Sequence, residues 1–349
     1  MGVSYLAVGW NRQKKIYDWV IFAFCVVYLI IFIGLTAIFN PAYTFETALI
    51  RSTSTLAVLL LHIILSIGPL SRINRKFLPL LYNRRHLGVT MFFVCFLHAS
   101  FSLFQFHSQG NVNPFVSLFT SNTHFDSIAD FPFQALGFFA LIIFFLMAIT
   151  SHDFWLHNLG PKAWKTLHMC VYLAYFLVIM HVMLGAIQYE TNPVYFIIIL
   201  IGSFTLITLH VYTGIIEVRL DYKQFEVKKD GFSKVCKVEE IEENRAKIVC
   251  IDKERIAIFK TGGKLFAVNN VCKHQNGPLG EGKVVDGCIT CPWHGYQYLP
   301  NNGQSPPPFN EKVTTYDVKV YEGNVWVNPL PYPEGTERPG AIIDMRNLK

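Results

Sequence analysis

Six apolar segments occupy most of the first 216 residues, and each is long enough and sufficiently free of charge to cross a lipid bilayer. They run from Trp19 to Phe39, Ser52 to Leu70, Leu87 to Phe106, Phe131 to Thr150, Thr166 to Gln188 and Pro193 to Ile216. The first is too long for the core of a signal peptide, so we expect it to remain as an anchor. The pattern predicts a membrane all-α six-helix bundle over residues 1–216.

Composition supports a membrane domain. Of the 349 residues, 52% are hydrophobic and only 15% are charged, which is too apolar for two ordinary soluble domains. The net charge of +6 is expected to reflect membrane topology and attraction to anionic lipid headgroups, and it indicates no nucleic acid partner. Eight cysteines without disulfide-like spacing favour a reducing compartment.

The basic residues predict the orientation in the membrane. Lysines and arginines lie before the first segment, between the second and third, and between the fourth and fifth: Arg12, Lys14, Lys15, Arg72, Arg75, Lys76, Arg84, Arg85, Lys162 and Lys165. The loops at 40–48, 107–130 and 189–192 have none. Because positive charge stays inside, both termini and the β domain are predicted to be cytoplasmic. The expected location is a bacterial inner membrane.

The composition changes after residue 216. Residues 217–232 form a charged connector, and short β-type runs begin near Ser233. Gly262-Gly263 and Asp286-Gly287 are predicted turns. These features predict a small all-β domain over residues 233–330, followed by an irregular tail over 331–349.

A paired Cys/His motif lies within this β domain. Cys272-Lys273-His274 is followed by sixteen residues and then by Cys291-Pro292-Trp293-His294. Two loops that each supply one thiolate and one imidazole can hold a two-iron cluster, with the cysteines on one iron and the histidines on the other. A zinc site of two cysteines and two histidines is the alternative, although zinc motifs usually do not mix the two residue types within one loop.

This C-x-H-x16-C-x2-H pattern, followed by Gly295, resembles the Rieske [2Fe-2S] family. Respiratory Rieske proteins have an additional cysteine in each loop, and this chain has other residues there. The resemblance is therefore to Rieske ferredoxins and oxygenase components, which implies a potential in the lower part of the Rieske range. Cys288 is interpreted as a small core residue. The run of prolines from Pro306 to Pro308 resembles the loop that covers Rieske clusters.

Five histidines lie inside the apolar segments, where ionisable side chains are costly and usually functional: His62, His98, His168, His181 and His210. His168 and His181 are thirteen residues apart, or about 20 Å along a helix. This spacing suits two haems at different depths, each with a second ligand from another helix. His98 is predicted to pair with His181 at the outer haem. His62 is favoured opposite His168, with His86 and His210 as alternatives.

A second resemblance covers most of residues 45–190. Gly68-Pro69-Leu70, Arg84-Arg85-His86-Leu87-Gly88, Leu97-His98 and the run from Thr150 through His168 to His181 are similar to the ferric reductase-like transmembrane family, in particular to the haem-binding membrane subunit of the bacterial methionine sulfoxide reductase system. The resemblance implies that His98, His168 and His181 bind haem. NADPH oxidases of this family have a further ligand where this chain has Arg84, so the fourth ligand and the second haem stay open.

Together the two motifs predict electron transfer between a cytoplasmic donor, such as a ferredoxin or flavin reductase, and a periplasmic oxidoreductase or quinone acceptor. No glycine-rich dinucleotide fingerprint is present, and the 55 residues after His294 are too few for the mononuclear iron domain of an oxygenase. Two alternatives stay open: an oxidoreductase that itself reduces ferric iron, oxygen or quinone, and a membrane-tethered redox sensor. Whether the chain is an enzyme is left open.

Overall fold

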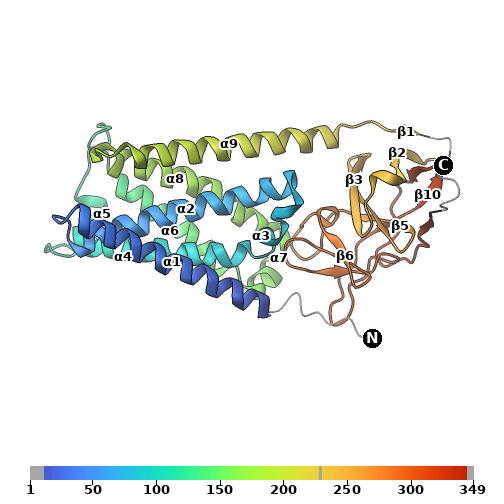
Figure 1. Ribbon diagram of the computed structural model, residues 1–349, viewed down its shortest axis with the longest axis horizontal. Coiled ribbons are helices and arrows are strands. Elements are labelled where there is room, and N and C mark those ends of the chain that lie inside the picture. The colour runs from blue at the N-terminus through green and yellow to red at the C-terminus, as the bar shows by residue number, and fades with distance from the viewer. Residues whose placement is uncertain (1–11, 228–229, 344–349) are drawn as a thin grey trace. The chain divides into compact units, whose positions relative to one another are not determined.

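The computed structural model describes residues 12–227 and 230–343, with helices first and strands after them (Figure 1). Parts of the predicted membrane domain, connector and tail, namely residues 1–11, 228–229 and 344–349, lie outside the described residues. The helices are α1 (Arg12–Phe39), α2 (Phe45–Ile73), α3 (Leu78–Tyr82), α4 (Arg84–His107), α5 (Pro114–Thr120), α6 (Phe133–Ile149), α7 (Asp153–Met169), α8 (Val171–Leu184) and α9 (Pro193–Asp221).

Five of the described helical segments are long and apolar enough to cross a membrane: Arg12–Phe39, Phe45–Ile73, Arg84–His107, Lys162–Tyr189 and Pro193–Asp221. The fourth predicted segment forms α6, which is apolar but only 17 residues long. At 1.5 Å per residue it spans about 26 Å, slightly less than a typical hydrocarbon core. The helical membrane domain is confirmed, whereas the count of six full spans is not.

One break lies before the predicted segment that carries His168 and His181, and a second divides it. Gly160 has a φ of 74°, which favours glycine, and it kinks α7. The helix breaks again at Cys170, so His168 belongs to α7 and His181 to α8. The predicted single helix is therefore two helices in series.

The helices combine a packed interior with an apolar exterior. Along α2, Leu56, Leu60 and Ile67 are at most 2% exposed. Trp19, Phe39 and Phe204 are 70%, 74% and 69% exposed, respectively. Large apolar side chains left this exposed are suited to contact with lipid.

In the described part of the β domain, the strands form three sheets. Sheet A has the order β1-β2-β11-β10, and sheet B has the order β12-β5-β4-β3 with β9 also paired to β5. A third sheet has the order β6-β7-β8. The bounds are β1 (Glu226–Val227), β2 (Ser233–Lys237), β3 (Arg245–Ile251), β4 (Glu254–Thr261), β5 (Lys264–Asn269), β6 (Lys283–Val285), β7 (Cys288–Thr290), β8 (Gln297–Tyr298), β9 (Thr315–Tyr316), β10 (Val318–Tyr321), β11 (Asn324–Val327) and β12 (Ala341–Ile342).

Both predicted glycine turns are present, since Gly262-Gly263 joins β4 to β5 and Asp286-Gly287 joins β6 to β7. Other boundaries differ from the prediction. Helix α9 continues to Asp221, and β1 pairs with β2 inside the predicted connector. The tail is not wholly irregular, because β12 pairs with β5 and extends sheet B.

Candidate metal centres

The two ligand loops have the same backbone hydrogen bonds. In the first, Cys272 N–H donates to the carbonyl of Gly277 (2.9 Å), and Asn276 N–H donates to the carbonyl of Cys272 (2.8 Å). In the second, Cys291 N–H donates to the carbonyl of Tyr296 (2.7 Å), and Gly295 N–H donates to the carbonyl of Cys291 (3.0 Å). Each loop thus forms a closed turn with its cysteine at the base.

The loops approach each other closely at Gly277. A Cβ atom at this position would lie 2.9 Å from Sγ of Cys291 and 3.0 Å from the ring of Trp293. Cys272 and Cys291 are 0% and 2% exposed, and both belong to the core cluster that includes Val268 of β5. The two thiols are therefore fixed at the interface of the loops and the sheet.

Hydrogen bonds favour the thiolate form of Cys272. Burial raises its pKa, but hydrogen bonds from the Cys291 thiol, the Tyr298 hydroxyl and the amides of His274 and Gln275 lower it below the ordinary value. A thiolate is the form of cysteine that binds metal. The pocket is therefore suited to a metal-bound sulfur at position 272.

His274 and His294 lie side by side and half-buried. Their ring centroids are 5.3 Å apart and their planes are at 80°. The ring of Tyr296 stacks on His274 at 4.9 Å with an interplanar angle of 9°, and its hydroxyl donates to Glu311. Phe309, beside the predicted proline loop, packs on Tyr296 at 4.8 Å. Two imidazoles this close can bind one iron, while the two thiols bind the other.

The structure agrees with the interpretation of Cys288. It is 1% exposed and is the first residue of β7. The eight cysteines, all within the described residues, are free. Cys272, His274, Cys291 and His294, which come from two loops with matching backbone turns, fit a [2Fe-2S] cluster.

Tyr298 is a site residue that the sequence analysis did not single out. Its hydroxyl lies 3.4 Å from Sγ of Cys272 and accepts a hydrogen bond from Lys273 N–H (3.0 Å). Burial and the charge on Cys272 raise the pKa of Tyr298, so the hydroxyl keeps its proton. Since its oxygen already accepts from Lys273, this proton is available to the sulfur. Its position four residues after His294 was the available sequence signal.

We expect Tyr298→Phe to lower the reduction potential of the cluster. A hydrogen bond to sulfur stabilises the extra negative charge of the reduced state. A net value of about 1 kcal/mol for the bond corresponds to roughly 40 mV for one electron. The measurement is an EPR-monitored redox titration. Tyr316→Phe is the control because Tyr316 is equally buried but bonds to Asn269 and Thr314. An unchanged potential in Tyr298→Phe contradicts the assignment.

In the membrane domain, His98 of α4 and His181 of α8 face each other. Their ring centroids are 6.4 Å apart and their planes are at 80°. The Nδ1 atom of His98 lies 3.1 Å from the carbonyl of Ile50, and that of His181 lies 2.9 Å from the carbonyl of Phe133. A hydrogen bond at Nδ1 leaves Nε2 as the atom able to bind a metal.

Gly137 of α6 lies against the ring of His181. A Cβ atom at this position would lie 2.8 Å from Cε1 and from Nδ1 of the ring. Any larger residue would displace the imidazole, so a glycine is required for the close packing of α6 and α8.

His168 and His62 are not brought together. The ring of His168 stacks on Trp164 at 3.8 Å, and its Nε2 lies 3.3 Å from Oγ1 of Thr150. Nε2 of His62 lies 3.2 Å from the hydroxyl of Tyr175, and Nδ1 lies 2.8 Å from the carbonyl of Val58. The structure gives no contact between these two imidazoles among the described residues.

The two alternative partners of His168 also have other neighbours. Nδ1 of His86 lies 2.7 Å from Oδ1 of Asp18 on α1. His210 points Nδ1 at the carbonyl of Leu206 (2.9 Å), and its ring packs on the edge of Tyr172 at 5.5 Å. The ligand opposite His168 therefore stays a prediction.

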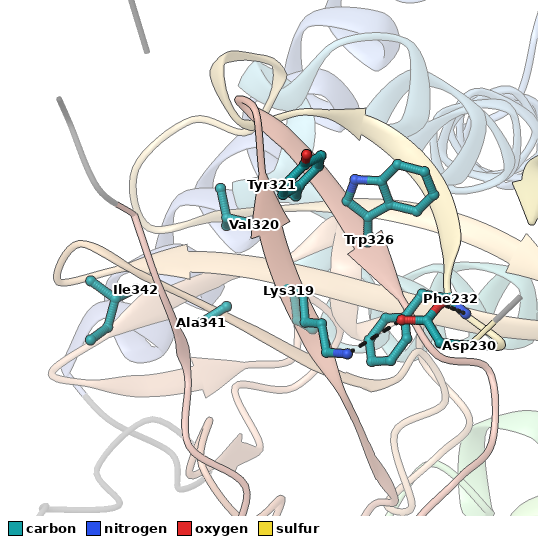
Figure 2. A pocket seen from close by; sticks show the side chains of 9 residues that line it. Asp230, Phe232, Lys319, Val320, Tyr321, Trp326, Ala341 and Ile342 are labelled. Atoms are coloured by element: carbon teal, nitrogen blue, oxygen red, sulfur yellow. Dashed lines mark hydrogen bonds and ion pairs between the residues drawn. The ribbon is translucent and has the colours of Figure 1, made fainter. Parts of the chain in front are cut away.

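A separate groove lies on the β domain and contains none of the four cluster ligands. Figure 2 shows its lining, which includes Tyr321, Trp326 and Ile342. Nζ of Lys319 lies 3.8 Å from the centroid of the Phe232 ring and 3.5 Å from Oδ2 of Asp230. This groove is formed by sheet A and β12, whereas the ligand loops flank the third sheet.

Comparison with known families agrees with both halves of this description. Residues 231–317 match the Rieske [2Fe-2S] domain, and residues 51–179 match the ferric reductase like transmembrane component. The β domain is similar to the anthranilate 1,2-dioxygenase ferredoxin subunit of Burkholderia cepacia, with 38% identity over 74 residues, which are 21% of this chain and 68% of that protein. It is also similar to the biphenyl dioxygenase ferredoxin subunit of Pseudomonas sp. (strain KKS102), with 32% identity over 100 residues, 28% of this chain and 91% of that protein.

Among solved structures, the Sphingomonas yanoikuyae B1 ferredoxin matches with 24% identity and a TM-score of 0.26, over 28% of this chain and 97% of that one. The resemblance to Rieske ferredoxins is confirmed by the curated relatives. The membrane-length helices and the transmembrane match identify a membrane protein with a redox or electron-transfer role. The chain belongs to the Rieske [2Fe-2S] family through its C-terminal domain, which follows a ferric reductase-like transmembrane domain.

Proposed function

We propose that this protein transfers electrons across a membrane, between a cytoplasmic donor and an extracytoplasmic or quinone acceptor. The observation that carries the proposal is the facing pair His98 and His181 inside the helices of a chain that also has the four Rieske ligands. Following the distribution of basic residues, we assign both termini and the β domain to the cytoplasm of a bacterium. The donor is a ferredoxin or a flavin reductase, and the acceptor is a periplasmic oxidoreductase or a quinone.

Cys272, Cys291, His274 and His294 hold the [2Fe-2S] cluster in this proposal. A bound cluster of this type accepts and donates one electron at a time. The protein contributes the buried thiols, the hydrogen bond from Tyr298 and the half-buried histidines. Because His274 and His294 are only half-buried, their side of the domain is the part that a donor can approach.

His98 and His181 hold a b-type haem in this proposal. A metal–nitrogen bond of about 2 Å on each side, with roughly 1 Å more to each ring centre, places two ligand rings about 6 Å apart. The observed separation is 6.4 Å. The carbonyls of Ile50 and Phe133 pair with the two Nδ1 atoms and so leave the Nε2 atoms for a metal, and Gly137 leaves room for the ring of His181.

The paired histidines favour a conduit over a self-contained oxidoreductase. A catalytic metal site keeps a coordination position open for substrate, whereas His98 and His181 would both be used to hold the haem, which would carry one electron at a time. We therefore expect electrons to pass to a separate acceptor rather than to a substrate bound at iron. The long loop at residues 107–130 is a suitable place for that acceptor to dock.

A second, inner haem at His168 is also proposed, with His62 as its other ligand. To hold this haem, Nε2 of His62 would have to give up its contact with Tyr175, and Nε2 of His168 its contact with Thr150. The test is His62→Ala, with optical and EPR spectra of the purified protein. If the inner haem signal is unchanged in His62→Ala, the ligand opposite His168 is His86 or His210. If the wild-type protein contains a single haem, there is no inner haem site.

The decisive experiment is a stopped-flow measurement on the purified protein in lipid vesicles. We expect a donor that reduces the cluster to reduce the haem afterwards, and a quinone or periplasmic acceptor to reoxidise that haem. A redox titration gives the reduction potentials of the cluster and the haem, and electrons flow from the centre of lower potential to the centre of higher potential. If cluster reduction is never followed by haem reduction, the conduit is wrong and the redox sensor is the better explanation. If the haem reduces ferric iron or oxygen directly at a high rate, the protein is an oxidoreductase in its own right.

A further inference from the structure

The C-terminal segment of residues 331–343, here called the strap, is fixed at both ends to the β domain. At its start, Tyr332 N–H donates to the carbonyl of Thr315 (3.0 Å). At its end, β12 pairs with β5, and Ile343 N–H donates to the carbonyl of Gly263 (3.0 Å). Ala341 and Ile342 of β12 also line the groove in Figure 2. The strap is therefore a folded element, and it lies beyond residue 317, where the Rieske match ends.

Arg338 anchors the middle of the strap. Its Nε donates to Oδ1 of Asp317 (2.8 Å), and its backbone N–H donates to the carbonyl of Asn301 (2.7 Å). Its guanidinium lies 4.1 Å from the centroid of the Tyr332 ring, and the Tyr332 hydroxyl also donates to Asp317 (2.7 Å). Asp317 is the residue between β9 of sheet B and β10 of sheet A, so Arg338 joins the strap to both sheets.

The strap then crosses the loop of residues 300–312, which contains the prolines beside the ligand site. Asn301 donates to Oε1 of Glu337 (3.1 Å). Gly335 has a φ of 83°, and a Cβ atom there would lie 2.9 Å from Gln304 and 2.9 Å from Lys312. The backbone of the strap thus lies directly against this proline loop.

Glu334 extends the contact to the first ligand loop. Its Oε1 lies 2.6 Å from Nζ of Lys273, the residue between Cys272 and His274. Both side chains are 45% exposed, so the pair alone contributes little to overall stability. The pair is relevant to the ligand site because it holds Lys273. The backbone N–H of Lys273 donates to the hydroxyl of Tyr298, which lies beside the Cys272 sulfur.

We propose that the strap holds the first ligand loop and the proline loop together and so retains the cluster, with Glu334 and Arg338 as positioning residues. The ligand loops have no disulfide, since the eight cysteines are free. Loss of a cluster requires a ligand loop to open, and a segment connected to Lys273, Asn301 and Asp317 opposes that opening. The strap thus supplies a cross-connection that the loops themselves lack.

The test compares cluster retention in the full-length protein. We expect Glu334→Gln with Arg338→Gln to lose its cluster about five-fold faster than the wild type in the presence of an iron chelator, as followed by visible absorbance. Hydrogen exchange of residues 271–278 should accelerate in the same variant. Glu239→Gln is the control because it removes the charge of an exposed carboxylate on the turn Val238–Glu240, which is not part of the strap.

Exchanging the charges of Lys273 and Glu334 tests whether this ion pair positions the ligand loop or only adds to the general stability of the domain. We expect Lys273→Glu alone to lose its cluster faster, and Lys273→Glu with Glu334→Lys to recover a rate close to that of the wild type. The cluster EPR spectrum should change in the single variant and return in the exchange. The proposal is overturned if the double glutamine variant matches the wild type in both measurements, if Glu239→Gln is equally fast, or if the exchange gives no recovery. None of these measurements depends on haem or on transmembrane electron transfer.

Discussion

Replacement of Cys291 by alanine is expected to eliminate the [2Fe-2S] cluster. The substitution removes one of the two thiolates. Because Cys291 and its neighbour Cys272 are both buried, a water molecule cannot take the place of the lost ligand. Without the cluster, the Rieske EPR signal should fall to background, and electron entry from a cytoplasmic donor should stop. The measurement is EPR of the reduced protein together with its iron content.

Cys288→Ala is the matched control. Cys288 lies three residues earlier, is equally buried at 1% exposed, and is not a proposed ligand. We expect it to keep the cluster and to lose only about 1 kcal/mol of stability from the small cavity. If Cys288→Ala removes the cluster and Cys291→Ala keeps it, the ligand set is wrong. If the wild-type protein contains zinc instead of iron, the assignment of a [2Fe-2S] cluster is wrong.

Replacement of His181 by alanine is expected to eliminate the outer haem. His98 would then be the one histidine of the pair left to hold the haem, and Gly137 and Phe133 offer no side chain that can replace an imidazole. The outer haem signal should disappear from the optical spectrum, while the Rieske EPR signal should persist. Haem content per protein and the EPR spectrum of the oxidised haem provide the measurement.

His210→Ala is the control for His181. It removes another histidine of the membrane helices, but its ring packs on Tyr172 and its Nδ1 faces the carbonyl of Leu206. We expect His210→Ala to retain the outer haem. Loss of every haem signal from a correctly folded His181→Ala protein contradicts two separate haem sites. If His181→Ala keeps the full outer haem signal, His98 and His181 are not the ligands of that haem.

The relative potentials of the centres depend on side chains that the motif does not contain. The absence of extra loop cysteines implied a potential in the lower part of the Rieske range, as in ferredoxins. The hydroxyl of Tyr298 beside Cys272 acts in the opposite direction, because it stabilises added negative charge. The balance determines whether electrons leave the cluster downhill toward the membrane, so the Tyr298→Phe titration bears on direction as well as on the site.

The membrane histidines show how far spacing can predict contacts. Depth along the helices favoured His98 with His181, and the structure brings these rings to 6.4 Å. Similar depth also favoured His62 with His168, yet His62 contacts Tyr175 and His168 contacts Trp164. Residue spacing gives the height of a side chain in a helix but not the face on which a neighbouring helix receives it. The break at Cys170 also places His168 and His181 in two different helices.

The sequence by itself determined the helical membrane domain, the β domain after it and the four residues of the Rieske motif. Apolar length and the local spacing of cysteine and histidine are properties of contiguous segments, so they are readable without the fold. Only the tertiary structure decided that Tyr298 reaches Cys272, that Gly137 accommodates His181 and that residues 331–343 form a strap connected to Lys273. These contacts join residues far apart in the chain, and they depend on how helices and strands pack and on which backbone groups remain to be paired.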